Sequence, residues 1–221
     1  MKALFINGSP RKNWNTHKLL ESSMKGASEA GAETELIHLY DYNYKGCISC
    51  FACKLKNAKT NGLCAFKDSL TPVLDKALNS DIVVMGSPIY FSYPTGMFRS
   101  FLERFLFPIM SYSNDENGKR LRAIDRTIYS GIIYTMNCPE DLAKQIHYPE
   151  FMMPNQSATE IVLGHCETLW AYNTYQFRDY SRYEANMFDE KVKAKYRDEN
   201  FDRDLQKAYE LGKRLVEKAK A

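Results

Sequence analysis

The chain has 221 residues, of which 44% are hydrophobic and 26% are charged, a composition typical of a folded globular protein. The formal net charge of +3 is small and evenly spread, which argues against a nucleic-acid partner. No apolar run approaches the roughly 20 residues that a membrane span needs, and Met1-Lys2 leads into a strand-like run rather than a signal peptide. We therefore expect a cytoplasmic protein without a membrane partner.

The first 40 residues predict a β-α-β unit. Residues 3–6 are an apolar run, as expected for a parallel strand that is buried on both faces. A helix begins near Thr16, carries apolar side chains at helical spacing, and ends at Gly31. Residues 33–39 alternate as a second strand. The stretch at 7–16, between the first strand and the helix, is rich in small polar residues.

The rest of the chain continues the alternation of helices and strands. The further expected elements are a helix at 68–79, a strand at 81–85, a helix from 95, a strand at 126–134, a helix at 158–166, a strand at 167–176 and a C-terminal helix at about 200–220. We expect residues 111–126 to be a surface connection, 140–156 a lid or a packing segment, and 177–198 a surface excursion or a dimer contact.

Five strands that alternate with helices predict an α/β fold with helices on both faces of a parallel sheet. The five-strand order 2-1-3-4-5 of flavodoxin-like folds fits this pattern better than the six-strand dinucleotide fold. We therefore expect residues 1–221 to form a single flavodoxin-like domain, a three-layer sandwich with an irregular Cys-rich loop at 41–67.

The stretch at 7–16 has the chemistry of a phosphate site, because a small polar loop that runs into a helix N-terminus presents N–H groups and a favourable dipole. It lacks both Gly-x-Gly-x-x-Gly and Gly-x-x-x-x-Gly-Lys-Ser/Thr, which disfavours a dinucleotide or triphosphate ligand. Ser9, Asn15 and Thr16 would donate hydrogen bonds to a phosphate monoester, and Arg11 would add positive charge. The alternative is an ordinary turn in which Asn15 or Thr16 caps the helix.

Two further loops are expected at the same edge of the sheet. In the order 2-1-3-4-5 a ligand binds beyond the carboxyl ends of strands 1 and 3, which places 86–95 beside 7–16. Thr135, after the fourth strand, is a third candidate, although a structural role is the simpler interpretation there. The second loop has residues that would pack along a flat cofactor ring or would instead close the core: Pro88, Ile89, Tyr90 and Phe91.

Three motifs carry a resemblance to a known family. In chain order they are Gly8-Ser9-Pro10-Arg11-Lys12-Asn13 with Asn15-Thr16, Cys47-x-x-Cys50-Phe51-x-Cys53, and Gly86-Ser87-Pro88-Ile89-Tyr90-Phe91. The chain resembles the flavodoxin-like NAD(P)H-dependent FMN reductases, a family that includes the iron–sulfur flavoproteins. The resemblance implies FMN bound by residues 9–16 and 88–91, hydride transfer from NAD(P)H, and a homodimer or homotetramer whose interface helps to build the site. Trp14 departs from the family, which commonly has glycine there.

The cysteines allow more than one interpretation. Cys47, Cys50 and Cys53 have a spacing that brings three thiolates together, as an iron–sulfur cubane needs, and Cys64 would be the fourth ligand of a [4Fe–4S] cluster. The gap before Cys64 is longer than in the iron–sulfur flavoproteins. The alternatives are a zinc site, or cysteines that bind no metal and line the flavin pocket or an oligomer interface.

Three hypotheses for function follow. The first is an FMN-dependent oxidoreductase that takes a hydride from NAD(P)H and passes electrons to a quinone, a flavin or a protein acceptor. The second is an iron–sulfur flavoprotein that acts as a non-enzymatic electron carrier, and the third is a domain that has lost its cofactor. Because the flavin would supply the chemistry, no residue is predicted to be catalytic. The acceptor and the choice between NADH and NADPH stay open.

Overall fold

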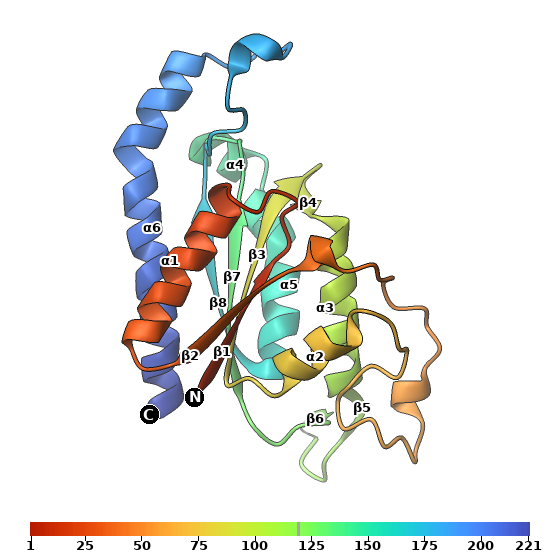
Figure 1. Ribbon diagram of the computed structural model, residues 1–221. Coiled ribbons are helices and arrows are strands. Elements are labelled where there is room, and N and C mark those ends of the chain that lie inside the picture. The colour runs from red at the N-terminus through yellow and green to blue at the C-terminus, as the bar shows by residue number, and fades with distance from the viewer. Residues whose placement is uncertain (119) are drawn as a thin grey trace.

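The computed structural model describes residues 1–118 and 120–221, and its centre is a twisted parallel sheet (Figure 1). The sheet has the order β2-β1-β3-β7-β8, and each neighbouring pair is parallel. Counted along the chain, these five strands have the order 2-1-3-4-5, so the predicted flavodoxin-like fold is confirmed. The strands are β1 (Lys2–Asn7), β2 (Glu33–His38), β3 (Ile82–Tyr90), β7 (Ile128–Thr135) and β8 (Gly164–Ala171).

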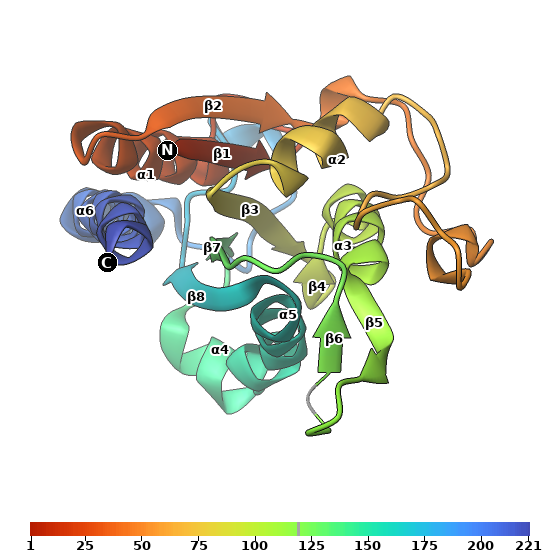
Figure 2. The ribbon, with the colours of Figure 1, turned by 90° about the horizontal axis from the view of Figure 1, so that it is seen from below.

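Helices cover both faces of the sheet and make three layers (Figure 2). One face carries α1 (Asn15–Glu29) and α6 (Glu190–Lys220), which pack against each other. The opposite face carries α2 (Thr71–Leu78), α3 (Gly96–Ile109) and α5 (Tyr148–Leu163), and the short α4 (Glu140–Gln145) lies beside α5.

The central strands supply both hydrophobic cores. In β1, Phe5 belongs to the core under α1 and α6, whereas the next residue, Ile6, belongs to the core on the other face. In β3, Val84 and Met85 divide in the same way, and all four side chains are fully buried. A strand that is buried on both faces needs apolar residues at consecutive positions, which explains the continuous apolar runs in the sequence.

Two glycines set the close crossing of α1 and α6. A Cβ atom added at Gly212 would lie 1.9 Å from the carbonyl oxygen of Ser23, and one added at Gly26 would lie 2.1 Å from that of Tyr209. Neither distance is available to a real side chain, so the two helices meet backbone to backbone. This crossing fixes the position of α1, whose N-terminus lies at the carboxyl edge of the sheet.

A partly buried carboxylate ties α6 to the sheet. Glu167 of β8 accepts hydrogen bonds from Arg214 at 2.7 Å and from His165 at 3.1 Å, and its carboxylate lies 3.2 Å from the Lys218 ammonium. Burial on its own raises the pKa of Glu167, but hydrogen bonds from these three groups outweigh it and lower the pKa to about 2. The carboxylate is therefore charged at neutral pH and holds α6 against β8.

The segment before the last strand differs from the prediction. The expected lid or packing segment at 140–156 is helical, and the helix expected at 158–166 is the second half of α5. The sequence did not predict the first half of α5 because Pro154 lies inside it. Proline removes a backbone donor and normally breaks a helix. The strand expected at 167–176 begins earlier, at Gly164, and ends at Ala171, since Gly164 ends α5 in the left-handed conformation and pairs with β7 at once.

Two surface segments also contain more structure than expected. The connection at 111–126 includes an antiparallel hairpin of β5 (Met110–Asn114) and β6 (Arg120–Arg122). The last part of 177–198 is helical, because α6 begins ten residues earlier than predicted. Asp189 caps it by accepting hydrogen bonds from two backbone N–H groups of its first turn, a signal that the sequence contains.

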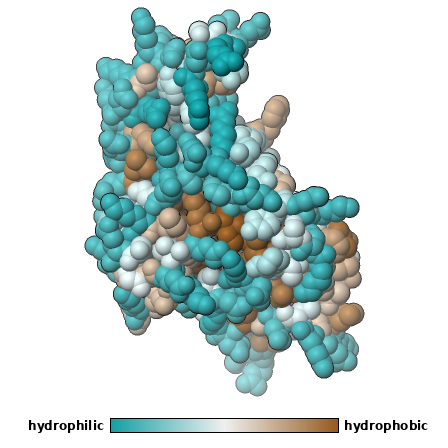
Figure 3. Space-filling view, in the orientation of Figure 1, coloured by the Kyte–Doolittle hydropathy of each residue, from teal (hydrophilic) through white to brown (hydrophobic). Residues whose placement is uncertain are grey.

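The molecular surface is mostly polar on the face seen in Figure 1. Figure 3 shows hydrophilic residues over most of this face, with a hydrophobic area near the centre. The end of the molecule where the segment between β8 and α6 projects is also hydrophilic. Among the described residues, none of the helices combines the length and the apolar character of a membrane span.

Candidate functional site

The loop between β1 and α1 is shaped by its own side chains. Asn7 Oδ1 accepts a hydrogen bond from the Ser9 N–H at 2.9 Å, and Ser9 Oγ accepts one from the Arg11 N–H at 3.1 Å. Trp14, the residue before the helix, is extended with a φ of −125°, so the loop needs no glycine there. Within residues 7–29, all of which are described, no side chain caps α1 and its first turn has no acidic residue. Its free N–H groups therefore favour an anion.

The loop after β3 is bonded directly to the first loop. The Gly8 N–H donates to the Gly86 carbonyl at 2.8 Å, and Thr95 Oγ1 donates to the Gly8 carbonyl at 2.7 Å. The Thr95 N–H in turn donates to Ser87 Oγ at 3.0 Å. A Cβ atom at Gly8 would lie only 2.8 Å from Phe98 Cβ, so this close approach needs glycine. The two loops thus lie side by side, as the strand order predicts.

Two further contacts complete the wall around the start of α1. Thr16 Oγ1 lies 2.8 Å from Thr135 Oγ1, and this buried hydroxyl pair joins α1 to the end of β7. The carbonyl of Tyr175 accepts hydrogen bonds from Trp14 Nε1 at 3.0 Å and Asn15 Nδ2 at 2.8 Å. The chain that follows β8 therefore crosses the carboxyl edge of the sheet and covers the first loop.

These segments enclose a cavity of about 100 Å³, which we call the edge cavity. It is lined by eight of the nine predicted cofactor residues, namely Ser9, Arg11, Asn15, Thr16, Pro88, Ile89, Tyr90 and Thr135. The other lining residues are Trp14, Met136, Asn137, Thr174, Tyr175 and Gln176. No carboxylate belongs to this lining, and the hydroxyl, amide and guanidinium donors suit a phosphate monoester.

Phe91 is the one predicted cofactor residue that the structure places elsewhere. It lies at the tip of the hairpin that joins β3 to β4 (Tyr93–Pro94), and its side chain is fully exposed. Phe91 and Ser92 have positive φ values of 47° and 70°, which a two-residue hairpin turn requires at both central positions. This turn directs Phe91 into solvent and away from the edge cavity.

The residues at 174–176 were missed because the sequence predicted that the last strand continues to Gln176. The strand ends at Ala171, and the chain then turns over the carboxyl edge. A signal was available, since residues that follow a strand of a parallel sheet lie at the edge where ligands bind.

A buried lysine supports the loop after β7. Lys193 of α6 donates to the carbonyl of Asn137 at 2.8 Å and to Asn173 Oδ1 at 2.6 Å. Burial lowers the pKa of Lys193 to about 8. The contact attaches one wall of the edge cavity to the C-terminal helix, so α6 supports the site from the face of the sheet that it shares with α1.

The four cysteines of the predicted cluster line one small cavity, of about 20 Å³, in the loop beside α3: Cys47, Cys50, Cys53 and Cys64. All four are free thiols, and burial raises the pKa of Cys53. In residues 1–118 and 120–221, no group of three or more His, Cys, Asp or Glu side chains is arranged to hold a metal ion. The fold therefore brings the thiols to one place without the geometry of a metal centre.

Two cations hold this cysteine loop on α3. The fully buried Arg104 guanidinium donates to Asp68 Oδ2 at 2.5 Å, to the Phe66 carbonyl at 2.6 Å and to the Lys45 carbonyl at 3.2 Å. Lys54 donates to two carbonyl groups at the C-terminal end of α3. Both positive charges lie beside the thiols, where they favour bound thiolates.

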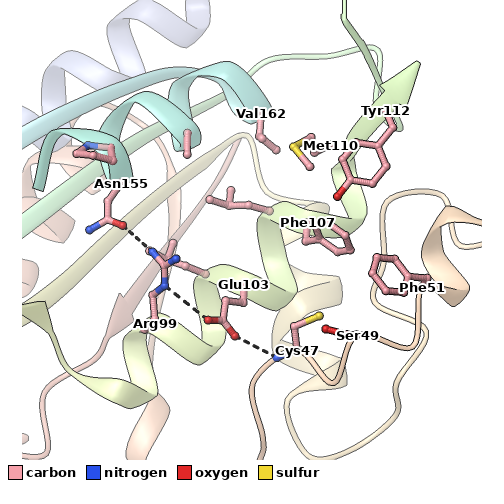
Figure 4. Close-up of a pocket in the computed structure, with 14 residues that line it drawn as sticks. Cys47, Ser49, Phe51, Arg99, Glu103, Phe107, Met110, Tyr112, Asn155 and Val162 are labelled. Carbon is pink, nitrogen blue, oxygen red and sulfur yellow. Dashed lines mark hydrogen bonds and ion pairs between the residues drawn. The ribbon is translucent and has the colours of Figure 1, made fainter. Parts of the chain in front are cut away.

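A larger apolar pocket, of about 560 Å³, lies between the cysteine loop, α3, α5 and β5 (Figure 4). A row of polar contacts runs along one side. Asn155 accepts from Arg99 at 2.8 Å, Arg99 lies 3.6 Å from Glu103, and Glu103 accepts from the Cys47 N–H at 3.2 Å. Figure 4 shows three aromatic rings at the other end, those of Phe51, Phe107 and Tyr112.

Comparison with known proteins identifies the family. The NADPH-dependent FMN reductase family matches residues 1–136, which is more than half of the chain. The chain belongs to this family. An iron–sulfur flavoprotein of Archaeoglobus fulgidus is 41% identical over 104 residues, and the match covers 47% of this chain and 48% of that protein. One from Methanocaldococcus jannaschii is 34% identical over 104 residues, covering 47% and 51%.

The FMN reductase family match includes ten of the fourteen residues that line the edge cavity and ends before the other four, Asn137 and 174–176. The matched segments span about half the length of these curated relatives, and residues 174–176 lie beyond the family match. Over nearly the whole chain, the fold is similar to that of an NAD(P)H:quinone oxidoreductase from Methanothermobacter marburgensis, with a TM-score of 0.68 and 14% identity over 97% of this chain and 98% of that one. At this identity the similarity supports the fold.

Proposed function

We propose that the protein is an FMN-dependent oxidoreductase that takes electrons from NAD(P)H and passes them to a second acceptor. The observation that carries the proposal is the edge cavity. Three separate segments, namely the first loop with the start of α1, the end of β3 and the end of β7, bring eight predicted residues to one cavity, at an uncapped helix N-terminus and without a carboxylate in its lining. Membership of the NADPH-dependent FMN reductase family supports FMN as the ligand.

In this proposal the first loop binds the phosphate of FMN. Ser9, Asn15 and Thr16 donate hydrogen bonds to it, and Arg11 adds charge. Asn15 and Arg11 now donate to backbone carbonyl groups of the segment after β8, Arg11 at 2.5 Å to Gln176. A charged phosphate oxygen is a stronger acceptor than a neutral carbonyl, so we expect these donors to exchange partners when FMN binds.

The walls formed by Pro88, Ile89, Tyr90 and Thr135 would contact the ring of the flavin. When bound, FMN supplies hydride and single-electron chemistry. The protein's side chains would bind and orient it. Partial burial of Tyr90 raises the pKa of its hydroxyl, which is therefore a neutral group at the edge of the site. No side chain is assigned an acid or base role.

We extend the proposal to a [4Fe–4S] cluster at Cys47, Cys50, Cys53 and Cys64. The cysteine spacing, the shared cavity and the two nearby cations support it, together with relatives that are named iron–sulfur flavoproteins. The described thiols do not have the geometry of a metal centre, so we assign no electron path through the cluster.

An electron carrier without enzymatic activity is the second candidate. The cysteine loop packs on the C-terminal half of α3, through Arg104 and the Phe107 carbonyl, and none of its cysteines lines the edge cavity. A flavin that exchanges single electrons with a partner would suit such a carrier without any step at the cysteines. The homodimer or homotetramer that the family resemblance implies would provide such a partner, as would another protein.

Absorbance of the purified protein, prepared without oxygen, tests these candidates. FMN bands that NADPH or NADH bleaches within seconds support the enzyme, whereas FMN bands that neither nucleotide bleaches support the carrier. A protein that takes up no FMN contradicts both. Iron and sulfide analysis tests the cluster independently of the flavin.

A matched pair of serine variants tests the phosphate site. We expect Ser9→Ala to weaken FMN binding by about tenfold, the effect of one hydrogen bond to a charged group. Ser113→Ala, on the exposed β5–β6 hairpin, should leave it unchanged. Equal FMN affinity of the two variants would contradict the assignment of the first loop.

A further inference from the structure

A second concave region, of about 440 Å³, adjoins the edge cavity. Arg11, Trp14 and Gln176 line both spaces, so the two are adjacent and share these side chains as a common wall. The second region is otherwise built from Lys12 and Asn13 of the first loop and from residues 177–183, which follow the segment that covers that loop. We call it the basic pocket.

The lining of the basic pocket is strongly cationic. It has four positive side chains, those of Arg11, Lys12, Arg178 and Arg182, and one carboxylate, that of Asp179. The Asp179 carboxylate accepts hydrogen bonds from the N–H and the hydroxyl of a neighbouring serine, at 3.0 and 2.6 Å. Arg178 and Arg182 lie within ion-pairing distance of no carboxylate in the described part of the chain. Both are exposed, so their charge is available to a ligand.

Flat aromatic faces accompany this charge. The Arg11 and Arg178 guanidinium groups lie 5.5 and 5.6 Å from the centre of the Trp14 ring. Phe177 and Tyr183 stack on each other with a centroid separation of 4.2 Å and an interplanar angle of 16°. Arginines that bind phosphates and aromatic faces that stack on a base are together the chemistry of a nucleotide site.

The basic pocket is also fixed in position relative to the edge cavity. The Trp14 side chain is anchored by its hydrogen bond to the Tyr175 carbonyl. Phe177, Arg178 and Arg182 lie outside the part of the chain that matches the family. The pocket therefore combines the first loop, which lies in the matched part, with a segment from beyond it.

We propose that the basic pocket binds the adenosine-phosphate half of the pyridine nucleotide, with Arg178 and Arg182 on its phosphates, and that it selects NADPH over NADH. The proposal rests on the proposed function, because the nucleotide must reach the flavin. The edge cavity lies next to the basic pocket, so a nucleotide that binds in one can extend towards the other. The 2′-phosphate of NADPH adds negative charge, which Arg178 and Arg182 favour; Lys12 contributes less, because it is paired with Asp41 at 2.5 Å.

Binding of nucleotide fragments that cannot reduce the flavin tests this subsite directly. We would titrate the FMN-loaded protein with 2′,5′-ADP and with 5′-AMP by calorimetry, using Arg178→Ala, Arg182→Ala and the control Lys213→Ala. Lys213 pairs with Glu217 on the exposed face of α6, far along the chain from the pocket. We expect 2′,5′-ADP to bind more tightly than 5′-AMP, and each arginine variant to weaken its binding by about tenfold. The FMN affinity and the control should not change.

The proposal is overturned if 2′,5′-ADP does not bind the wild type or binds all three variants equally. FAD shares the adenosine-phosphate chemistry, so FAD is titrated into the flavin-free protein as a separate arm. Tighter binding of FAD than of FMN, lost in Arg178→Ala, would assign the pocket to the flavin's own adenosine and refute the assignment to a pyridine nucleotide.

These experiments distinguish failure of the proposed function from failure of the nucleotide subsite. If FMN does not bind, the proposed function is wrong, and titration of the flavin-free protein with 2′,5′-ADP still decides whether the nucleotide subsite exists. If NADPH reduces the bound flavin with a KM that Arg178→Ala and Arg182→Ala leave unchanged, the proposed function stands and the subsite is refuted.

Discussion

Replacement of Arg104 by methionine tests whether a buried ion pair holds the cysteine loop in place. The Arg104 side chain is fully buried, and the side chain of its partner, Asp68, is 16% exposed. The Arg104 guanidinium lies 2.5 Å from Asp68 Oδ2. Methionine keeps most of the length and the apolar packing of arginine but has no donor. The substitution therefore leaves the Asp68 carboxylate and two backbone carbonyls without their buried donor.

The expected cost follows from burial. Removal of one partner of a buried ion pair destabilises a protein by about 3–5 kcal/mol, because the other charge stays uncompensated. The pair of Lys76 and Glu35 has the same distance of 2.5 Å, but each side chain is 50% exposed. Exposed pairs contribute about 0–1 kcal/mol. Lys76→Met is thus a control matched in chemistry and distance that differs in burial.

Urea unfolding followed by circular dichroism measures both variants. We expect the free energy of unfolding to fall by about 3–5 kcal/mol in Arg104→Met and by less than about 1 kcal/mol in Lys76→Met. Hydrogen exchange of residues 45–68 separates local release of the loop from a global loss of stability. If the two variants lose the same stability and the loop stays protected, the assigned role of Arg104 is wrong.

Three other substitutions probe the helix crossing, the charge cluster and the flavin site. Gly212→Ala places a methyl group against the Ser23 carbonyl and should lower the free energy of unfolding by about 1–3 kcal/mol; an unchanged urea midpoint would show that the helices can separate freely. Because the folded-state pKa of Glu167 is lowered from 4.5 to about 2, its charge stabilises the fold above pH 4.5 and loses this effect as the pH falls towards 2. Glu167→Gln should therefore cost about 2 kcal/mol at pH 7, after allowance for solvent screening, and little at pH 2; a cost independent of pH would exclude the charge as its cause. Thr16→Val should raise the FMN dissociation constant by about tenfold, measured by quenching of flavin fluorescence, and an unchanged constant would remove Thr16 from the phosphate site.

The sheet order and most of the edge cavity could be predicted because both depend on short, local patterns. Consecutive apolar residues such as Val84 and Met85 identify a strand that is buried on both faces. Once the strands are known, the parallel order places the loops after β1 and β3 together. Ser9, Thr16 and Pro88 could therefore be assigned to one place, since Ser9 and Thr16 belong to the connection from β1 into α1 and Pro88 lies near the carboxyl end of β3.

The unpredicted features depend on contacts between distant parts of the chain. Tyr175 lies over the first loop because its carbonyl accepts hydrogen bonds from Trp14 and Asn15, which are about 160 positions earlier in the sequence. Pro154 concealed a helix that tertiary packing maintains. Phe91 points into solvent because of its turn, and its aromatic character alone indicated a buried contact.

The segment over the first loop divides the molecule into two parts with different freedom to change. The loops after β1 and β3 and the end of β7 lie in the part that matches the family, and they must keep one spacing to enclose a flavin. Residues 174–183 form a separate cover, joined to the first loop through backbone carbonyl groups that any sequence would provide. Side chains at 177–183, which do not line the edge cavity, can therefore be exchanged without rebuilding the cavity beneath. Under the proposed role of the basic pocket, exchange of these residues between relatives would transfer the preference for the electron donor and leave FMN binding unchanged.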